Sequence, residues 1–472
     1  MITTSQVRRW RGPTAVALGI LMVGLDNYVV VTTLPTIRAQ LRTGIAQSQW
    51  VMTAYLLGWV CALLPAGRLG GRFGRRRFLL AGLAVFGVAS ATASQCTSAG
   101  ALIATRAAMG LGAALIMALT LPVMADAFPG DRRSPATAVT TAAVMLGMPL
   151  GPLVTGLLLT RFSWGSVFLL NLPIVALAIS GIACSVPESR DPYALPMDWP
   201  GLLLSGTGVT ALAYGIISGP ADGWSAPHVR AALAAGVVLL AAFARHELTT
   251  AAPLLELRVL ADRQVAPAVA ASAVASLTTS GTLFALTPFL QTVRHGSALA
   301  TGVDLLPLAV GVTAGGAVSD LLADRWGGRT TLCSGLLLAA GGEAALIRLT
   351  PGSGCPVILA ALALFGTGLG ITSTAASDAV LDALPRARLR AGGGLSRFLQ
   401  SLGTALGPAL LGTVLNTAYR NRASDSATAS PATLVPAAYG TGIHWAMSVG
   451  TGLLLLTALA VLIFIRIRVD EL

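Results

Sequence analysis

Long apolar stretches, separated by short polar segments, follow one another along the whole chain of 472 residues. Most are about 20 residues long, the length at which an α-helix crosses the hydrocarbon core of a bilayer. A membrane-spanning β-strand needs only about 10 residues and alternates strictly in polarity, so the pattern excludes a β-barrel. We therefore predict fourteen transmembrane helices, at residues 13–36, 49–69, 76–95, 100–127, 134–160, 164–187, 199–218, 227–248, 265–291, 298–322, 329–349, 355–378, 391–418 and 440–466.

The composition agrees with an all-α membrane protein whose main partner is the lipid bilayer. Hydrophobic residues make up 54% of the chain and charged residues 11%, with a mean hydropathy of +0.76. Soluble domains carry about 25% charged residues. The formal net charge of +12 does not indicate nucleic-acid binding, because the arginines are distributed between the apolar stretches instead of forming one basic segment.

The distribution of arginine predicts the orientation of the chain in the membrane. If the predicted loops alternate between the two sides, 21 of the 31 arginines lie on the side of the termini and 8 on the other. Cytoplasmic loops carry the excess of positive residues, so we expect both termini in the cytoplasm of a bacterium and a multi-pass protein of its cytoplasmic (inner) membrane. The small-residue-rich segment 419–440 is predicted to be an extracytoplasmic loop.

Two pairs of segments reveal an internal repeat. "LGMPLGPLVTG" (146–156) and "LGTALGPALLG" (402–412) match at six of eleven positions with an offset of 256. "LGGRFGRR" (69–76) and "LADRWGGR" (322–329) recur with an offset of 253, and both offsets equal eight predicted helices. The chain is therefore predicted to hold two six-helix bundles, which are separated by two inserted helices: 13–187, 199–248 and 265–466. Repeated halves around a midplane site are typical of secondary transporters.

One acidic residue lies in the middle of the first predicted helix. Asp26 occurs in "GLDNYVVVTTLP", and no other charged residue lies between Arg11 and Arg38. A carboxylate at the bilayer centre costs about 3 kcal/mol on insertion scales, and a low-dielectric environment favours its protonated form. Asp26 is therefore our candidate for proton coupling; the alternative is a structural carboxylate that is hydrogen-bonded inside the bundle and never titrates.

Six segments in a fixed order resemble the fourteen-span drug:proton antiporters of the major facilitator superfamily, from about residue 20 to about residue 416. They are "LDNYVVVTTLP", "QWVMTAYLL" (49–57), "GRLGGRFGRRR" (67–77), "ATRAAMGLGAA" (104–114), "GMPLGPLVTG" (147–156) and "WGSVFLLNLP" (164–173). The resemblance implies the major facilitator fold and proton-driven export of amphipathic small molecules by alternating access. We also expect no cofactor other than the coupling proton, and a protein that functions as a monomer. Enzymatic activity is not expected, because the four histidines lie in or near predicted loops or span ends, with no nucleophile or metal partner nearby in sequence: His228, His246, His295 and His444.

Several further residues are candidates for the transport site. The family's arginine in the fourth span is thought to assist proton transfer, which favours a role for Arg106 over snorkelling to the outer edge. Asp304 is either a second protonation or substrate-binding carboxylate or an outer-rim residue in water. Glu343 lies in a span that is peripheral by analogy with the superfamily, so we predict a structural or snorkelling role. The candidates for substrate contact are Asn27, Tyr28, Thr32 and Tyr55.

Two glycine-rich motifs of the family complete the candidates. The resemblance implies a cytoplasmic latch made of Gly67, Arg72, Gly74, Arg75, Arg76, Asp324 and Arg325. The family usually has an aspartate where this chain has Gly71, so we expect the first half of the latch to be weakened. The motif of the fifth span, which the family associates with antiport, contains Gly147, Gly151, Pro152 and Gly156. On physical grounds alone the same small residues could serve only close helix packing.

Other functions stay open at this stage. The chain could export one metabolite or antibiotic that its host makes, or it could be a proton-independent uniporter or importer. A transporter-like sensor or scaffold without flux is a third alternative, which any measured turnover would exclude. ATP is not expected, because no G-x-x-x-x-G-K-[ST] phosphate loop occurs.

Overall fold

We describe the protein from a computed structural model, which covers residues 4–127, 143, 146–147, 150–191, 196–350, 354–384, 389–425 and 431–465. Within these ranges the regular structure is helical throughout. The helices are α1 (Thr4–Leu41), α2 (Ile45–Phe73), α3 (Arg75–Ala93), α4 (Ala99–Ala127), α6 (Ser166–Leu169), α7 (Asn171–Ser185), α8 (Trp199–Asp222), α9 (Pro227–Thr249), α10 (Val265–Pro288), α11 (Ala298–Asp304), α12 (Leu306–Trp326), α13 (Gly328–Ile347), α14 (Cys355–Ala383), α15 (Leu389–Asp425) and α16 (Pro431–Phe464).

The described residues contain thirteen helices that are long and apolar enough to cross a membrane. A shorter apolar helix, Leu150–Leu159, forms the end of the predicted fifth span, whose remainder lies mostly outside the described residues. The prediction of an all-α membrane protein is thus confirmed.

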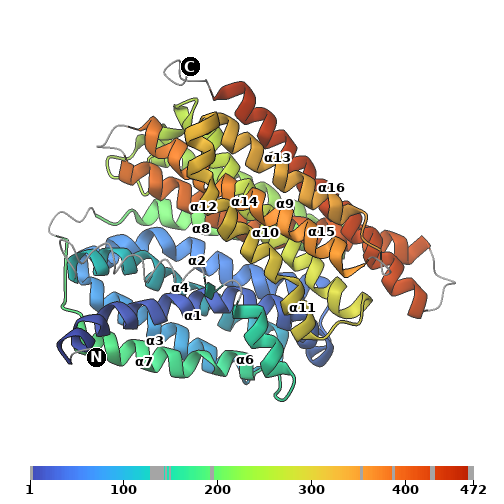
Figure 1. Cartoon of the computed structure of the whole chain (residues 1–472), viewed down its shortest axis with the longest axis horizontal. Coiled ribbons are helices and arrows are strands. Elements are labelled where there is room, and N and C mark those ends of the chain that lie inside the picture. Colours follow the sequence, from blue (N-terminus) through green and yellow to red (C-terminus); the bar gives the residue numbers. More distant parts are fainter. Residues whose placement is uncertain are drawn as a thin grey trace. The chain divides into compact units, whose positions relative to one another are not determined.

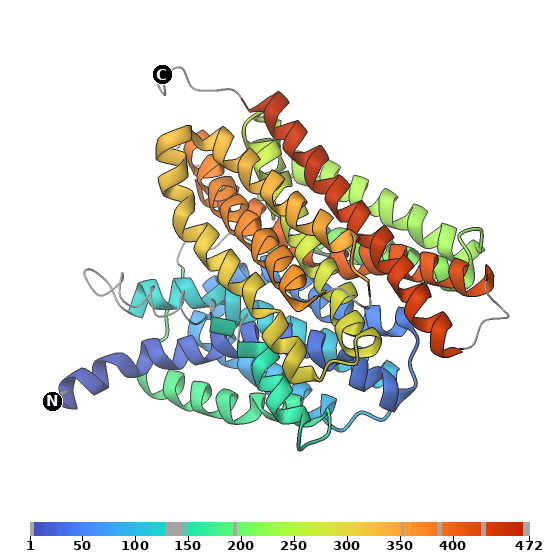
Figure 2. The same cartoon turned by 45° about the vertical axis from the view of Figure 1, so that its right-hand side comes forward.

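The contacts divide the chain into two units. Unit 1 comprises Met1–Thr43 and Ala54–Gly206, and unit 2 comprises Gly44–Thr53 and Thr207–Leu472. In unit 1, α1 packs against α4 and α7, and α3 packs against the same two helices (Figure 1). In unit 2, α13 packs between α14 and α16, while α10 contacts α14, α15 and α16 (Figure 2). The division into two bundles and an insert stays a prediction.

The helices differ from the sequence-based expectation in several places, and two of these lie in unit 2. The predicted span 298–322 is interrupted at Leu305, because Pro307 near the start of α12 cannot donate a backbone hydrogen bond to the preceding turn. The predicted loop 419–440 is shorter than expected, since α15 continues to Asp425 and α16 already begins at Pro431. Alanine is common in this segment and favours helix even where the sequence is too polar to read as a membrane span.

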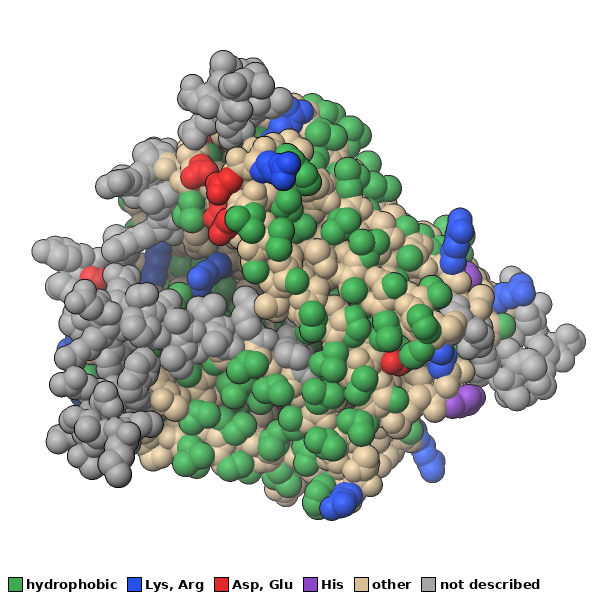
Figure 3. All heavy atoms as spheres, viewed as in Figure 1, with side chains coloured by type: hydrophobic (Ala, Val, Ile, Leu, Met, Phe, Trp, Pro, Cys, Tyr) green, Lys and Arg blue, Asp and Glu red, His purple; other side chains and the backbone are tan. Residues whose placement is uncertain are grey.

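Large apolar side chains remain exposed along the outside of the helices. On α16, for example, Leu456, Ile463 and Phe464 are each more than half exposed. Figure 3 shows apolar side chains spread over one face of the molecule, with charged side chains mainly toward its margins. An apolar surface of this extent is unfavourable in water and suits contact with lipid.

Candidate functional site

A buried ion pair joins α1 to α4 in unit 1. The Asp26 side chain is 1% exposed and that of Arg106 is 2% exposed, and Nη1 of Arg106 lies 2.5 Å from Oδ2 of Asp26. Among the described residues this is the one ion pair with both partners buried. Arg106 therefore points inward and does not extend to the outer edge. A buried pair of this kind compensates charges that would be strongly unfavourable alone.

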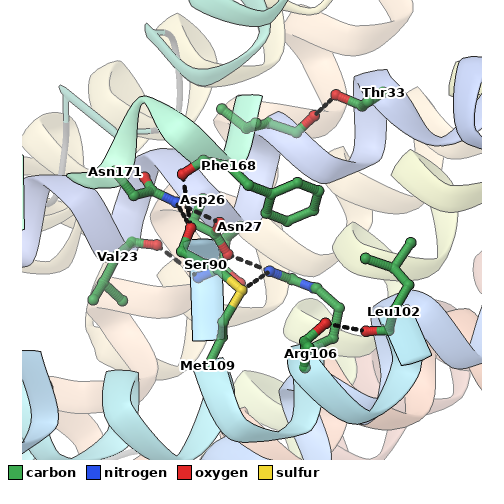
Figure 4. A network of polar contacts seen from close by, with 12 residues as sticks. Val23, Asp26, Asn27, Thr33, Ser90, Leu102, Arg106, Met109, Phe168 and Asn171 are labelled. Atoms are coloured by element: carbon green, nitrogen blue, oxygen red, sulfur yellow. Dashed lines mark hydrogen bonds and ion pairs between the residues drawn. The ribbon is translucent and has the colours of Figure 1, made fainter. Parts of the chain in front are cut away.

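A third helix contributes an amide to the same carboxylate. Nδ2 of Asn171, at the start of α7, donates to Oδ1 of Asp26 at 3.2 Å and to Oγ of Ser90 on α3 at 3.0 Å. Ser90 in turn donates to the backbone carbonyl of Phe168 at 2.8 Å. Figure 4 shows Arg106 and Asn171 approaching Asp26 from different sides. Four helices of unit 1 thus hold the carboxylate in one orientation.

Aromatic side chains of α2 cover the arginine. The guanidinium carbon of Arg106 lies 4.1 Å from the ring centroid of Tyr55, within the range of a cation–π contact. Tyr55 is 1% exposed, and its ring centroid lies 6.2 Å from that of Trp59. In the described part of the chain, the Tyr55 hydroxyl and the Trp59 indole nitrogen are buried without a hydrogen-bond partner. Each of these two groups is thus a hydrogen-bond donor that the described residues leave unused.

The described hydrogen bonds of two candidate substrate contacts, Asn27 and Thr32, stay within α1. Nδ2 of Asn27 donates to the carbonyl of Val23, four residues earlier, at 3.4 Å. The Thr32 hydroxyl donates to the carbonyl of Val29 at 3.0 Å. Tyr28 is half-buried. A contribution of Asn27, Tyr28 and Thr32 to substrate binding stays a prediction.

The glycines of the predicted antiport motif lie against α1 next to Asp26. A Cβ on Gly147 would come within 2.7 Å of the backbone of Gly24, and one on Gly151 within 2.8 Å of Cβ of Tyr28. Pro152 and Gly156 are also buried. Small residues thus allow this helix to approach the segment of α1 that carries the carboxylate, as expected where helix backbones pack closely.

The predicted latch residues of the first half lie where α2 meets α3. Gly74 adopts φ 129°, which favours glycine, and begins α3 directly beside the Glu188 carboxylate. The backbone N–H groups of Arg76 and Arg77 donate to that carboxylate at 3.0 and 3.2 Å, an acidic partner at a helix N-terminus. The Glu188 carboxylate thus anchors the first turn of α3.

Arg75 forms ion pairs with carboxylates of other segments of unit 1. Gly71, at the position where the family usually has an aspartate, has no carboxylate to offer. Arg75 pairs with Asp126 at the end of α4 and, at 3.6 Å, with Asp191. The backbone N–H of Asp191 also donates to the carbonyl of Gly71 at 2.8 Å. The expected weakening of the latch stays a prediction, but Arg75 has carboxylate partners in this structure.

The other residues predicted for the latch or for proton coupling are not among the described partners of Asp26. Gly67 and Arg72 are exposed on α2, and Asp324 and Arg325 are exposed in the last turn of α12. Asp304 ends α11, is half-buried, and accepts a hydrogen bond from the Cys355 thiol at 3.4 Å. The latch and coupling roles of these residues stay predictions.

Sequence reasoning missed Asn171 and Ser90. Asn171 is the one amide residue in the predicted span 164–187, which is a signal of the same kind as an isolated aspartate. Ser90 carried no such signal, because small hydroxyl residues are common in transmembrane helices and usually bond to their own backbone. Its partners became visible only once α3 and α7 were placed side by side.

Comparison with known proteins extends these observations. The sequence profile of the Major Facilitator Superfamily matches residues 16–408. The chain belongs to the Major Facilitator Superfamily. Its relatives include the multidrug efflux pump LfrA of Mycolicibacterium smegmatis, with 31% identity over 91% of this chain and 85% of the relative. The puromycin resistance protein pur8 of Streptomyces alboniger is 32% identical over 98% of this chain and 92% of the relative.

Solved structures of superfamily transporters share the fold. A bacterial homologue of the human lysosomal transporter Spinster, in an inward-facing and unoccupied conformation, has a TM-score of 0.70. The match covers 97% of this chain and 98% of that one at 16% identity. The nucleoside transporter NupG matches with a TM-score of 0.68 at 12% identity. These neighbours are transporters and not enzymes, and at such identities they speak for the fold alone.

Proposed function

We propose that the chain is a proton-coupled antiporter that exports amphipathic small molecules across the bacterial cytoplasmic membrane. The observation that carries this proposal is the buried Asp26–Arg106 pair in the transmembrane part of unit 1. A carboxylate that must take up and release a proton within the membrane needs an environment that tolerates both of its charge states. Arg106 stabilises the ionised state, and the neutral acid removes the need for that partner.

The proposed cycle couples the charge of Asp26 to the orientation of the binding site. Asp26 takes up a proton from the outside while the substrate leaves there. After the protein has reopened to the cytoplasm, Asp26 releases the proton, re-forms its ion pair with Arg106, and substrate binds again. Substrate and proton thus use alternate states of one site, which makes the exchange obligatory.

The surroundings of Arg106 support an amphipathic substrate. Tyr55 and Trp59 offer apolar rings together with a hydroxyl and an indole N–H that have no partner among the described residues. Amphipathic drugs combine a large apolar surface with a few polar groups, and rings that carry a donor can contact both. We further propose the proton as the coupling ion, no bound cofactor, a single chain as the working unit, and cytoplasmic termini.

The test uses purified protein in liposomes under an imposed pH gradient. The lumenal pH is followed while lipophilic cations and neutral antibiotics, puromycin among them, are added to wild type and to Asp26→Asn. We expect substrate to trigger proton movement in wild type and much less proton movement in Asp26→Asn, because the carboxyl group that exchanges the proton is lost. Asp304→Asn, which changes a half-buried carboxylate of unit 2, is the matched control.

Each other outcome assigns a different mechanism. Equal proton movement in wild type and Asp26→Asn would remove Asp26 from the coupling. Loss only in Asp304→Asn would transfer the coupling to Asp304. Substrate flux without any proton movement would contradict antiport and leave a uniporter.

A second candidate is a dedicated exporter of a single antibiotic. The observation that favours it is the match to the puromycin resistance protein over 98% of this chain. The same panel separates the two candidates, because a dedicated exporter responds to one compound and a multidrug pump to several of unrelated structure.

A further inference from the structure

A second carboxyl group is fully buried in unit 2. The Glu343 side chain, on α13, is 0% exposed, which rules out the predicted snorkelling. Its Oε1 accepts a hydrogen bond from the Thr282 hydroxyl on α10 at 3.0 Å. Gly450 of α16 also faces the Glu343 carboxyl group, because a Cβ added to Gly450 would come within 2.0 Å of Oε1. In the described part of the chain, Oε2 of Glu343 has no hydrogen-bond partner.

No positive charge in the described residues pairs with this carboxyl group. The titratable side chains on α13 and on the helices packed around it are Asp320, Asp324, Arg325, Arg329, Cys333, Cys355, Asp378, Asp382, Tyr439 and His444. α10 carries none. Arg348, the C-cap residue of α13, follows Glu343 by five residues, about 8 Å along the helix, and is exposed. His444 precedes Gly450 by six residues, about 9 Å along α16, and its Nε2 contacts the carbonyl oxygen of Leu349 at 3.0 Å.

The acidic residues of α14 are farther along their helix. Phe365 lies opposite Gly342, the neighbour of Glu343 in the chain. Asp378 follows Phe365 by thirteen residues, about 20 Å along the helix axis. An ionised Glu343 would therefore be a carboxylate without a counter-ion in an apolar environment, which is strongly unfavourable.

The internal repeat relates this site to the Asp26 site. Thr282 lies 256 residues after Asp26, and Glu343 lies 253 residues after Ser90; these are the two offsets found between the repeated segments. In unit 1 the polar contacts join α1, α3 and α7, and in unit 2 the corresponding contacts join α10, α13 and α16. Each repeat thus has one buried acidic residue among the corresponding three helices. Asp26 lies on the first helix of its repeat, whereas Glu343 lies on the third helix of the other.

We propose that Glu343 is a second proton-binding site, which holds a proton in the state seen here and exchanges it. The hydroxyl of Thr282 orients the carboxyl group, and the missing side chain at Gly450 leaves room for it. Together with Asp26, Glu343 gives each repeat one protonatable carboxyl group. With two such groups, the proposed antiport would move two protons for each substrate molecule. This stoichiometry rests on the proposed function, whereas the proton-binding site itself does not.

The first test detects the proton without any substrate. Infrared difference spectra are recorded for the purified full chain between about pH 5 and about pH 9, in the carbonyl region of protonated carboxylic acids. We expect a band that disappears at alkaline pH in wild type and is absent at every pH from Glu343→Gln. Thr282→Val should keep the band but shift its frequency, because the hydrogen bond to Oε1 is lost.

Glu247→Gln is the matched control for this experiment. Glu247 is also a buried glutamate of unit 2, but its Oε2 accepts the backbone N–H of Leu255 at 2.8 Å near the end of α9. This variant should leave the Glu343 band in place. A band that does not change with pH would make Glu343 a permanently protonated structural acid and overturn the proposal. Identical spectra from wild type and Glu343→Gln would also overturn it.

The second test counts the coupled protons. Liposomes with the membrane potential clamped at zero are given a series of pH gradients, and the steady-state gradient of puromycin is measured. Each coupled proton multiplies the attainable gradient by about ten for each pH unit. Glu343→Gln should therefore lower the attainable puromycin gradient by about tenfold for each unit of the pH gradient. If the puromycin gradient depends on the pH gradient as steeply in this variant as in wild type, the stoichiometry of two protons is wrong. Failure of wild type to move puromycin with protons would count against antiport of this compound, while the infrared result still decides the state of Glu343.

Discussion

Asn171 is the residue through which α7 and α3 reach the central carboxylate. Its amide donates to both Asp26 and Ser90, so its loss leaves two buried acceptors without that donor. Leaving a buried polar group unsatisfied costs about 1–3 kcal/mol, more than a hydrogen bond usually contributes. The amide is therefore expected to matter for the stability of unit 1 as well as for the orientation of Asp26.

We predict that Asn171→Ala destabilises the protein by about 1–3 kcal/mol, measured as a lower midpoint of thermal unfolding in detergent. Asn27→Ala is the matched control, since the Asn27 amide is half-buried and its described bond goes to the carbonyl of Val23 on its own helix. Asn27→Ala should change the stability of the protein by no more than about 0.5 kcal/mol. Equal losses in the two variants would show that the contact with Asp26 does not stabilise the fold.

At the level of the helices, glycines decide which pairs come close. α2 and α4 touch backbone to backbone: a Cβ on Gly110 would lie 2.0 Å from the carbonyl oxygen of Tyr55, and one on Gly58 2.3 Å from that of Ala107. This contact places the Tyr55 ring over the Arg106 guanidinium, since Tyr55 and Arg106 lie on these two helices. Helix packing and site geometry are therefore not independent here.

Gly110→Ala is predicted to force α2 and α4 apart. Overpacking of this kind costs about 1–3 kcal/mol and should also weaken the stacking of Tyr55 on Arg106. Thermal unfolding measures the first effect, and substrate-triggered proton movement measures the second. Gly100→Ala, on the same helix α4 but with nothing within 4 Å of the added Cβ, should leave both unchanged. A neutral Gly110→Ala would contradict the close approach.

For the whole molecule, the distribution of arginine makes a prediction about topology. Two cysteines are exposed in the structure, Cys184 near the end of α7 and Cys355 at the start of α14. With cytoplasmic termini, Cys184 lies near the cytoplasmic side and Cys355 near the outer side. We predict that a membrane-impermeant maleimide labels a Cys355-only variant in intact cells, and a Cys184-only variant only after the cells are permeabilised. The reverse pattern would invert the topology.

Much of the architecture could be predicted from the sequence because membrane insertion depends on local properties. The length and polarity of each stretch decide whether it can span the bilayer, so thirteen of the helices were expected from the hydropathy pattern. Asp26 was found for the same reason, since one acidic residue in an apolar stretch requires compensation. The repeat could likewise be read directly from its two offsets.

The partners of these residues were decided only by the tertiary structure. Asp26, Arg106 and Asn171 are separated by up to 145 positions, and no local pattern says that their side chains meet. The burial of Glu343 against Thr282 was also hidden, because a single-helix pattern does not say which face its neighbours cover. The sequence by itself determined which segments enter the membrane and which charges need partners, whereas the packing of the helices selected those partners.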